Sequence, residues 1–161
     1  MIALAIGFLL VIIFMFVKYR FFGLITNATL IINLFILLGV LTLFEATLTL
    51  PGIAGIILTV GMAVDANVLI FERIKEELKD ETNNILAFDG GYTKSRTAII
   101  DANITTLLAA VILFFMGSGP VKGFAVTLGV GIFTTLFSVY FIARLFTSLY
   151  VSKNKNSGKL I

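Results

Sequence analysis

Residues 51–71 decide the fold: they read PGIAGIILTVGMAVDANVLIF, and the charged run ERIKEELKD follows at residues 72–80. A helix needs about 20 predominantly apolar residues, with a range of about 17 to 25, to cross the hydrocarbon core of a bilayer. Residues 51–71 have this length, and Asp65 is the one charged residue among them. The stretch therefore predicts a membrane-spanning helix that continues into a polar segment at the membrane surface.

Four further apolar stretches surround this one, and each is long enough to cross a bilayer. They lie at residues 1–17, 22–44, 98–116 and 123–146. The first is not typical of a signal peptide, because it lacks a basic start and a small-residue cleavage site. The sequence therefore predicts an all-α integral membrane protein whose residues 1–146 form a five-helix transmembrane bundle.

The composition supports a membrane protein and excludes several kinds of site. Of the 161 residues, 59% are hydrophobic and 13% are charged, a balance that a soluble domain of this size could not bury. The net charge of +3 is spread over short segments between the apolar stretches, which does not indicate a nucleic-acid partner. The chain has no Cys and no His, which excludes disulfides, thiolate or imidazole metal ligands, and Ser-His or Cys-His catalysis. We expect no metal, no cofactor and no enzymatic activity.

The basic residues predict how the bundle is oriented. If the connections alternate between the two faces of the membrane, all of the 12 Lys and Arg residues except Lys122 fall on one face. The positive-inside rule makes that face cytoplasmic. We therefore predict an N-terminus outside and a C-terminus in the cytoplasm. Because such a first span would have to export its N-terminus unaided, we also expect a segment upstream of it.

Residues 72–96 form the one long connection and are predicted to be a cytoplasmic helical hairpin at the membrane surface. Their start continues the third span as an amphipathic helix, in which Arg73 and Glu77 pair at i,i+4. The run TNN at residues 82–84 and the glycine pair at residues 90–91 are expected to interrupt the helix. Residues 147–161 are predicted to be a basic cytoplasmic tail, of which residues 152–159 are polar and expected to be disordered.

Two carboxylates lie inside predicted spans, Asp65 and Asp101, each in an Asp-Ala-Asn tripeptide. A charged side chain at the centre of a span costs about 2.5 to 3.5 kcal/mol even on the lenient scale, so such residues usually face a pathway. A rise of 1.5 Å per residue places the two carboxylates at similar depths, about 10 Å and about 7 to 8 Å. We predict both as members of a proton relay. A structural pairing with Arg96 is the competing interpretation for Asp101.

Further polar side chains accompany the two carboxylates as relay members or as interhelical hydrogen-bonding groups. Residues i and i+2 of a helix point to nearly opposite sides, so Asp65 and Asn67 are not expected to face one cavity. Gly61, one turn before Asp65, is predicted to let another helix approach the carboxylate. The supporting polar residues are Asn67, Asn103, Thr105 and Thr106.

With these residues identified, residues 61–78, GMAVDANVLIFERIKEEL, resemble the signature of the SecD side of the SecD/SecF family. The resemblance continues through IDANITT at residues 100–106, GSGPVKGFA at residues 117–125 and TLGVG at residues 127–131. It covers residues 1–146, and a string of this length is very specific.

The resemblance implies one half of a permease of the resistance-nodulation-division (RND) superfamily in the bacterial inner membrane. The implied function is the membrane part of an accessory translocase subunit that couples the proton motive force to protein export. The implied partners are SecF, the SecYEG channel with SecA, membrane lipid, and a preprotein bound by a periplasmic domain that this chain lacks. Asp65 would belong to the proton pathway at the interface with SecF.

Four other interpretations stay open at this point. A small-molecule or lipid exporter of the same superfamily would share the fold. A sodium-coupled translocase is the second, because Asp, Asn and Thr oxygens suit a hard cation. The third is a structural scaffold for a partner. The fourth is an intramembrane aspartyl protease built on Asp65 and Asp101, although neither follows the Gly-x-Gly sequence of those proteases.

Overall fold

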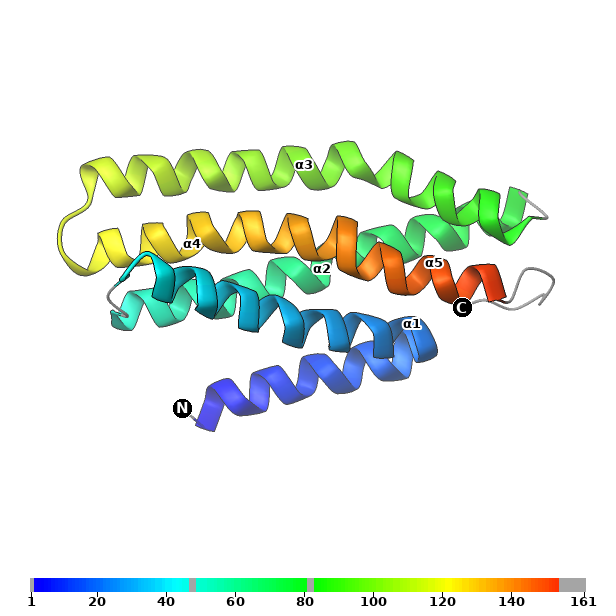
Figure 1. Cartoon of the computed structure of the whole chain (residues 1–161), viewed down its shortest axis with the longest axis horizontal. Coiled ribbons are helices and arrows are strands. Elements are labelled where there is room, and N and C mark those ends of the chain that lie inside the picture. The colour runs from blue at the N-terminus through cyan, green and yellow to red at the C-terminus, as the bar shows by residue number, and fades with distance from the viewer. Residues whose placement is uncertain (1, 47–48, 81–82, 154–161) are drawn as a thin grey trace.

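The structure of the chain is a computed structural model that describes residues 2–46, 49–80 and 83–153. The described residues are helical apart from short turns (Figure 1). The elements are, in chain order, α1 (Ile2–Leu43), α2 (Leu50–Asp80), α3 (Asn84–Met116), α4 (Pro120–Phe137), the π-helix η1 (Ser138–Ala143) and α5 (Arg144–Lys153). The prediction of an all-α chain is confirmed.

The described part of the chain has four helices long and apolar enough to cross a membrane, so the prediction of five is wrong. The predicted spans 1–17 and 22–44 belong to one element, α1, in which Arg20 has a non-helical conformation (φ 48°, ψ −113°). The chain reverses direction there, and Figure 1 shows the first arm of α1 running back alongside the second. Residues 18–21 contain no Gly or Pro that would predict the end of a helix. The non-helical conformation of the single residue Arg20 is enough to reverse the chain.

The two arms of α1 pack closely against each other. A Cβ atom at Gly23 would collide with the carbonyl group of Met15, so this approach requires glycine. Farther from the reversal, Asn27 Nδ2 donates a hydrogen bond to the carbonyl oxygen of Ile12 at 3.1 Å. α1 is therefore a helical hairpin held by contacts between its arms.

The adjoining ends of α2 and α3 provide residues 72–80 and 84–96 of the predicted connection 72–96. Asn83 caps α3 by accepting a hydrogen bond from the Ile85 amide at 3.0 Å. The glycine pair at residues 90–91 lies inside α3, so the interruption predicted there is wrong. Both glycines face α2, where the missing side chains let the two helices come close.

The last apolar helix changes its winding near its middle. α4 passes into the six-residue π-helix η1 before α5 begins. α5 ends at Lys153 and buries Thr147 and Val151, so the first residues of the predicted tail 147–161 are helical. Residues 154–161 lie outside the described residues.

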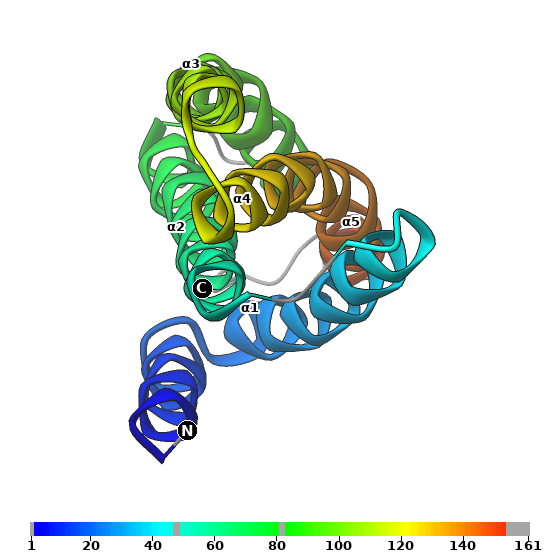
Figure 2. The same ribbon diagram turned by 90° about the vertical axis from the view of Figure 1, so that its left-hand side faces the viewer.

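α2 occupies the centre of the contacts between helices. It packs against both α3 and α4, and the second arm of α1 lies along α4, η1 and α5 (Figure 2). The first arm of α1 lies at the edge of the bundle, away from α3 (Figure 2).

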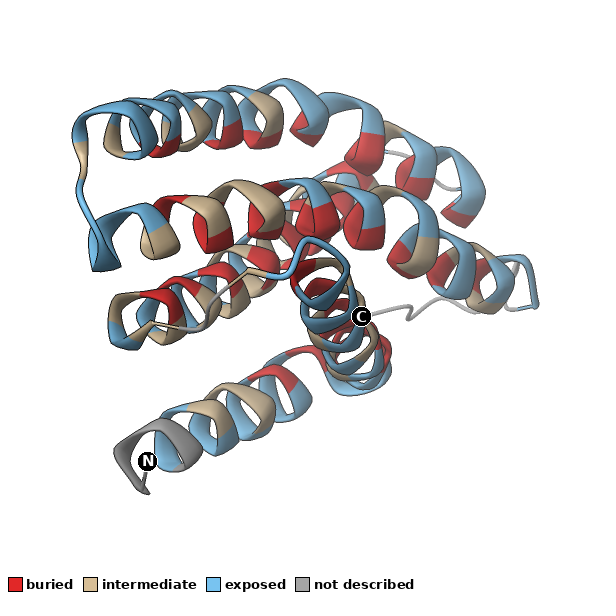
Figure 3. Cartoon of the chain, turned by 60° about the vertical axis from the view of Figure 1, so that its left-hand side comes forward, coloured by how far each residue is buried: buried red, intermediate tan, exposed pale blue. Residues whose placement is uncertain are grey.

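The exterior of the bundle is apolar, and polar side chains lie inside it. Phe35 on the outside is 71% exposed, whereas Thr59 and Asn33 are 0% and 2% exposed. Figure 3 shows exposed faces along the outer side of every helix and buried faces between them. The interior also contains an apolar core, so it is the apolar exterior that differs from a soluble protein and fits a chain whose outer surface meets lipid.

Candidate functional site

Asp65 lies midway along α2 and opens onto a small cavity between α2 and α3. The cavity has a volume of about 100 Å³, and its polar lining comes from Asp65, Asn103 and Thr106. Met62, Ala66 and Leu69 of α2 provide part of its apolar lining. Asp65 is exposed and makes no hydrogen bond or ion pair with any described residue. Among the described residues the carboxylate is therefore unpartnered.

Asn67 points away from Asp65, into the interior of the bundle. It is 2% exposed, and its Nδ2 atom donates to the carbonyl oxygen of Ala63 at 2.8 Å. Its Oδ1 atom is buried without a hydrogen-bond partner among the described residues. The expectation that Asp65 and Asn67 face different sides of α2 agrees with this geometry.

The second Asp-Ala-Asn tripeptide repeats the arrangement on α3. Asn103 is 7% exposed, its Nδ2 atom donates to the Ile99 carbonyl oxygen at 2.7 Å, and its Oδ1 atom has no partner among the described residues. Asp101 is exposed and does not line the cavity beside Asp65. The cavity therefore combines the carboxylate of the first tripeptide with the amide of the second.

The polar residues predicted to join helices bond within their own helix instead. Thr105 and Thr106 donate to the carbonyl oxygens of Asp101 and Ala102 at 2.9 and 3.0 Å. Asn67 and Asn103 use their amide groups in the same way. None of the four forms a hydrogen bond between helices among the described residues. The Oδ1 atoms of both asparagines are buried without a partner among the described residues, as are Asn27 Oδ1 and the hydroxyl oxygens of Tyr92 and Tyr140.

Two further expectations about the carboxylates differ from the geometry. Arg96 and Asp101 form no ion pair in the described chain, so the structural pairing is absent here. A catalytic acid pair needs two carboxylates that share a site, and Asp101 does not reach the cavity of Asp65.

Gly61 does not serve helix packing inside this chain. A Cβ atom added there would meet no described atom within 4 Å. Close packing occurs instead between α2 and α4, where Gly131 lies against Thr59 and Gly55 lies against Thr127. A signal for this contact was present in the sequence, because small residues recur at four-residue spacing in α4.

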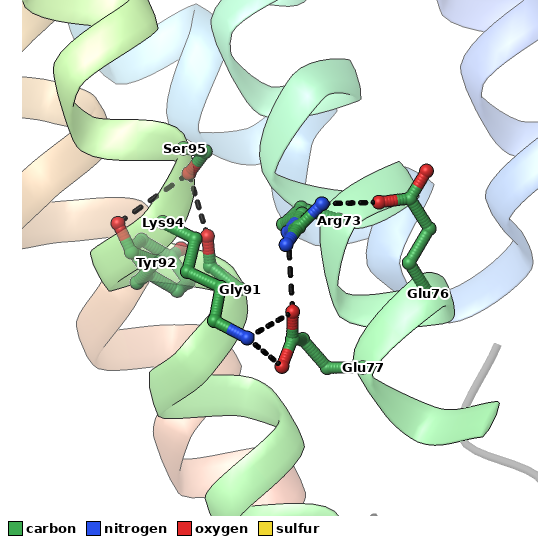
Figure 4. A network of polar contacts seen from close by, with 7 residues as sticks. All are labelled: Arg73, Glu76, Glu77, Gly91, Tyr92, Lys94 and Ser95. Carbon is green, nitrogen blue, oxygen red and sulfur yellow. Dashed lines mark hydrogen bonds and ion pairs between the residues drawn. The ribbon is translucent and has the colours of Figure 1, made fainter. Parts of the chain in front are cut away.

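A charged cluster joins α2 to α3 beyond the apolar part of the bundle (Figure 4). The predicted pair of Arg73 and Glu77 is present at 3.1 Å, and Lys94 of α3 adds a contact of 2.7 Å to the Glu77 carboxylate. Gly90 leaves room for this carboxylate, since a Cβ atom there would lie 3.2 Å from Glu77 Oε2. The hydrogen bond from Lys94 is the largest cause that lowers the pKa of Glu77, and the charges of Lys94 and Arg73 add to it.

A second charged cluster fixes the reversal of α1 against α2. The Tyr19 hydroxyl donates to Glu72 Oε1 at 2.7 Å, and Lys18 lies 3.3 Å from the same oxygen. Lys75 is 3.5 Å from this oxygen and 4.6 Å from the centre of the Tyr19 ring. Both clusters position α2, the helix that carries Asp65.

A buried hydrogen-bonded group joins α1 to the start of η1 and was not predicted. Asn33 Nδ2 donates to Thr135 Oγ1 at 3.3 Å, and Ser138 Oγ donates to Asn33 Oδ1 at 3.1 Å. Ser138 is the first residue of the π-helix. Hydrogen bonds from α1 thus hold the start of η1. Short π-helical segments of this kind are often found at functional sites.

Comparisons with known proteins agree with this architecture. Residues 1–153 match the family model described as protein export membrane protein SecD/SecF, C-terminal. The chain is 56% identical over 142 residues to protein translocase subunit SecD of Desulfurispirillum indicum. The matched region covers 88% of this chain and 28% of that protein. It is 52% identical over 157 residues to the SecD subunit of Rickettsia prowazekii, covering 96% of this chain and 30% of that protein.

The crystal structure of SecDF from a Thermus species, described as a translocon-associated membrane protein, has a similar fold. The TM-score is 0.90 at 41% sequence identity, over 93% of this chain and 21% of that one. A second SecDF crystal structure gives a TM-score of 0.89 at 40% identity. The chain thus spans less than a third of the length of these relatives.

Proposed function

Because the chain belongs to the SecD/SecF family of protein-export membrane proteins, we propose that it is the membrane part of a Sec-pathway translocase subunit that couples the proton motive force to protein export. One observation carries this proposal: Asp65 is a carboxylate in the middle of an apolar helix, beside a polar cavity, with no partner among the described residues. Acidic residues in such places mark ion pathways.

Asp65 acts as the switch in this proposal. Its charged form is costly in an apolar environment unless polar groups or a cation attend it, whereas its protonated form is tolerated. Each charge that crosses a potential of 100 mV releases about 2.3 kcal/mol. This energy can shift an equilibrium between two helix arrangements by about fiftyfold. Protonation of Asp65 would select one arrangement, and release of the proton would select the other.

SecF is the proposed partner that completes the site. Gly61, Asp65 and Leu69 lie on one face of α2 at four-residue spacing, and all three are exposed in this chain. The open position at Gly61 would let a partner helix come close to the carboxylate, as predicted for another helix. The partner would then supply the second wall of the cavity and the groups that receive the proton.

The remaining partners and the orientation follow from the same proposal. The chain is a multi-pass bacterial membrane protein. We place its N-terminus outside and its C-terminus in the cytoplasm, with SecYEG and SecA beside it and the preprotein held by another part of the assembly. The relatives are translocase subunits, which favours protein export over export of small molecules or lipids and favours transport over catalysis.

Sodium is the alternative coupling ion, and one observation favours it. The Asn103 Oδ1 atom is an unpartnered acceptor on a residue that lines the cavity with Asp65 and Thr106. Three oxygen-bearing side chains of this kind suit Na⁺ as well as a hydrated proton. Asp101 remains a proposed second relay position outside the cavity.

Gradient-dependent preprotein export by the complete complex tests the proposal. Asp65→Asn is expected to abolish the gradient-dependent part of export while the amount of complex is unchanged, because an amide cannot exchange a proton. Asp80→Asn, at the end of the same helix, is the matched control and is expected to export normally. If the complex with Asp65→Asn exports like the parent, Asp65 has no coupling role, and the chain is a structural scaffold for its partner. The same assay with Asp101→Asn tests its place in the relay.

A further inference from the structure

A groove on the side of the bundle, between α3 and the helix formed by α4, η1 and α5, has no role in the proposed function. Its main hollow has a volume of about 520 Å³, and a neighbouring hollow of about 740 Å³ shares Tyr140, Phe141 and Arg144 with it. The groove is therefore continuous along the outer surface of η1. It lies away from the cavity of Asp65, with which it shares no lining residue.

The polar part of the groove is positively charged. Arg96 and Arg144 both line the main hollow. Arg144 bonds to Asp89 at 2.8 Å and lies 5.5 Å from the centre of the Tyr92 ring. Arg96 makes no ion pair with any described residue. One positive charge at the mouth of the groove is therefore left without a counter-ion in the described chain.

The Tyr140 hydroxyl adds an unused hydrogen-bonding group to these charges. Its oxygen is buried and has no partner among the described residues. Tyr140 lies in η1, and Arg144, four residues later, begins α5. Both residues line the main hollow, which brings a tyrosine side chain and a guanidinium group together there.

The rest of the groove is apolar and faces outward. Phe137 and Phe141 are 48% and 66% exposed, and their rings stack at 5.2 Å. Arg96 lies just before the predicted span 98–116, and Arg144 lies close to the end of the predicted span 123–146. The two cations are therefore at the level where the headgroups of a bilayer would meet its hydrocarbon core, and the aromatic wall lies on the hydrocarbon side.

We propose that this groove binds an anionic phospholipid of the same leaflet, with its phosphate between Arg96, Arg144 and the Tyr140 hydroxyl and an acyl chain along Phe137 and Phe141. Basic hollows between membrane helices at the cytoplasmic surface recognise such headgroups. Guanidinium groups bind phosphate oxygens through charge-assisted hydrogen bonds, and the unpaired charge of Arg96 favours an anionic lipid over a zwitterionic one. The lipid would fasten α3 to η1 and α5.

The test uses the complete purified complex, because the groove must be in its natural surroundings. The complex is reconstituted in phosphatidylcholine vesicles with and without phosphatidylglycerol, extracted, and analysed by native mass spectrometry for bound lipid. The parent is expected to retain phosphatidylglycerol in preference to phosphatidylcholine. Arg96→Gln is expected to weaken this retention about fivefold, which corresponds to about 1 kcal/mol for one basic side chain near an anionic headgroup.

Two further variants separate binding from folding. Tyr140→Phe removes one hydroxyl group and keeps the ring, so it is expected to weaken retention without changing the amount of complex. Arg20→Gln is the matched control, because Arg20 is exposed and makes no ion pair with a described residue. Equal retention by the parent, Arg96→Gln and Tyr140→Phe would overturn the proposal, as would equal binding of the two lipids. Either result would mean that protein or unselected lipid fills the groove.

Discussion

At the scale of single residues, the repeated Asp-Ala-Asn tripeptide has an exposed Asp side chain and a buried Asn side chain in both α2 and α3. The opposite directions of Asp65 and Asn67 could be predicted, because the angle between residues i and i+2 is a local property of a helix. That Asp65 and Asn103 line the same cavity could not be predicted. It depends on how α3 is rotated about its axis, which is set by burial of Ile99 and Ala110 along the same face.

The two asparagines offer a matched pair for testing the cavity. Both are buried, and both bond to a carbonyl oxygen of their own helix, but Asn103 lines the cavity of Asp65 and Asn67 does not. Asn103→Ala is expected to reduce gradient-dependent export several-fold, because the cavity loses a polar atom beside the carboxylate. Asn67→Ala is expected to leave this coupling intact, although it removes the same kind of bond to a carbonyl oxygen of its own helix as Asn103→Ala does.

Export measured per unit of assembled complex separates these effects. Equal losses of coupling in the two variants would contradict a special role of the cavity and would indicate that both amides act through stability alone.

At the scale of elements, the positions of the apolar stretches could be predicted from length and hydropathy, but their joining could not. The reversal at Arg20 and the uninterrupted helix through the glycine pair 90–91 both depend on tertiary contacts, which override local helix signals. The sequence pattern indicated a pair between Arg73 and Glu77 because these residues are close along one helix. Lys94 joins them only because α3 returns alongside α2.

The glycine contact between these helices gives a stability prediction. A Cβ atom at Gly91 would collide with the Ile74 side chain and would lie 2.9 Å from its backbone nitrogen. Gly91→Ala is therefore expected to destabilise the complex by about 1 to 3 kcal/mol, the usual cost of overpacking. Thermal unfolding of the purified complex measures the change.

Gly129→Ala provides the control for Gly91→Ala, because a Cβ atom at Gly129 meets no described atom within 4 Å. Alanine there is expected to be neutral or slightly stabilising, since it is the better helix former. A Gly91→Ala variant that unfolds at the same temperature as Gly129→Ala would show that α2 and α3 do not approach closely.

The charged cluster of Glu77 predicts a dependence of stability on pH. The pKa of Glu77 is lowered in the folded chain below its ordinary value of 4.5, first by the Lys94 hydrogen bond. A lowered pKa means that the folded state binds the proton less readily than the unfolded state. The stabilising contribution is therefore complete above pH 4.5 and is lost as the pH falls through the folded pKa.

Thermal unfolding of the parent and Glu77→Gln complexes between neutral and acidic pH measures this contribution. The two melting temperatures are expected to differ at neutral pH and to converge at acidic pH. Asp80→Asn, a carboxylate without an ion pair among the described residues, should follow the parent throughout. A gap between parent and Glu77→Gln that stays constant with pH would contradict a stabilising ionised Glu77.

At the scale of the whole molecule, the chain is a lipid-facing bundle in which Asp65, a carboxylate in an apolar helix, is exposed. The apolar exterior follows from composition and could be predicted. The residue pattern alone does not predict the open face around Asp65, because an apolar stretch with one acid has the same pattern whether the acid faces its own bundle or a partner. The family resemblance does imply an interface with SecF at Asp65. The chain spans 28% of the length of the Desulfurispirillum relative.

Proton flux through the complete complex, reconstituted in sealed vesicles with a pH-sensitive dye inside, tests the role of Asp65 most directly. With a gradient imposed and sodium absent, the parent and Asp80→Asn are expected to carry protons, and Asp65→Asn is expected to carry none at equal protein content. Flux that appears only when a sodium gradient is supplied would identify sodium as the coupling ion. Undiminished proton flux through Asp65→Asn would contradict the assignment of Asp65 as the coupling carboxylate.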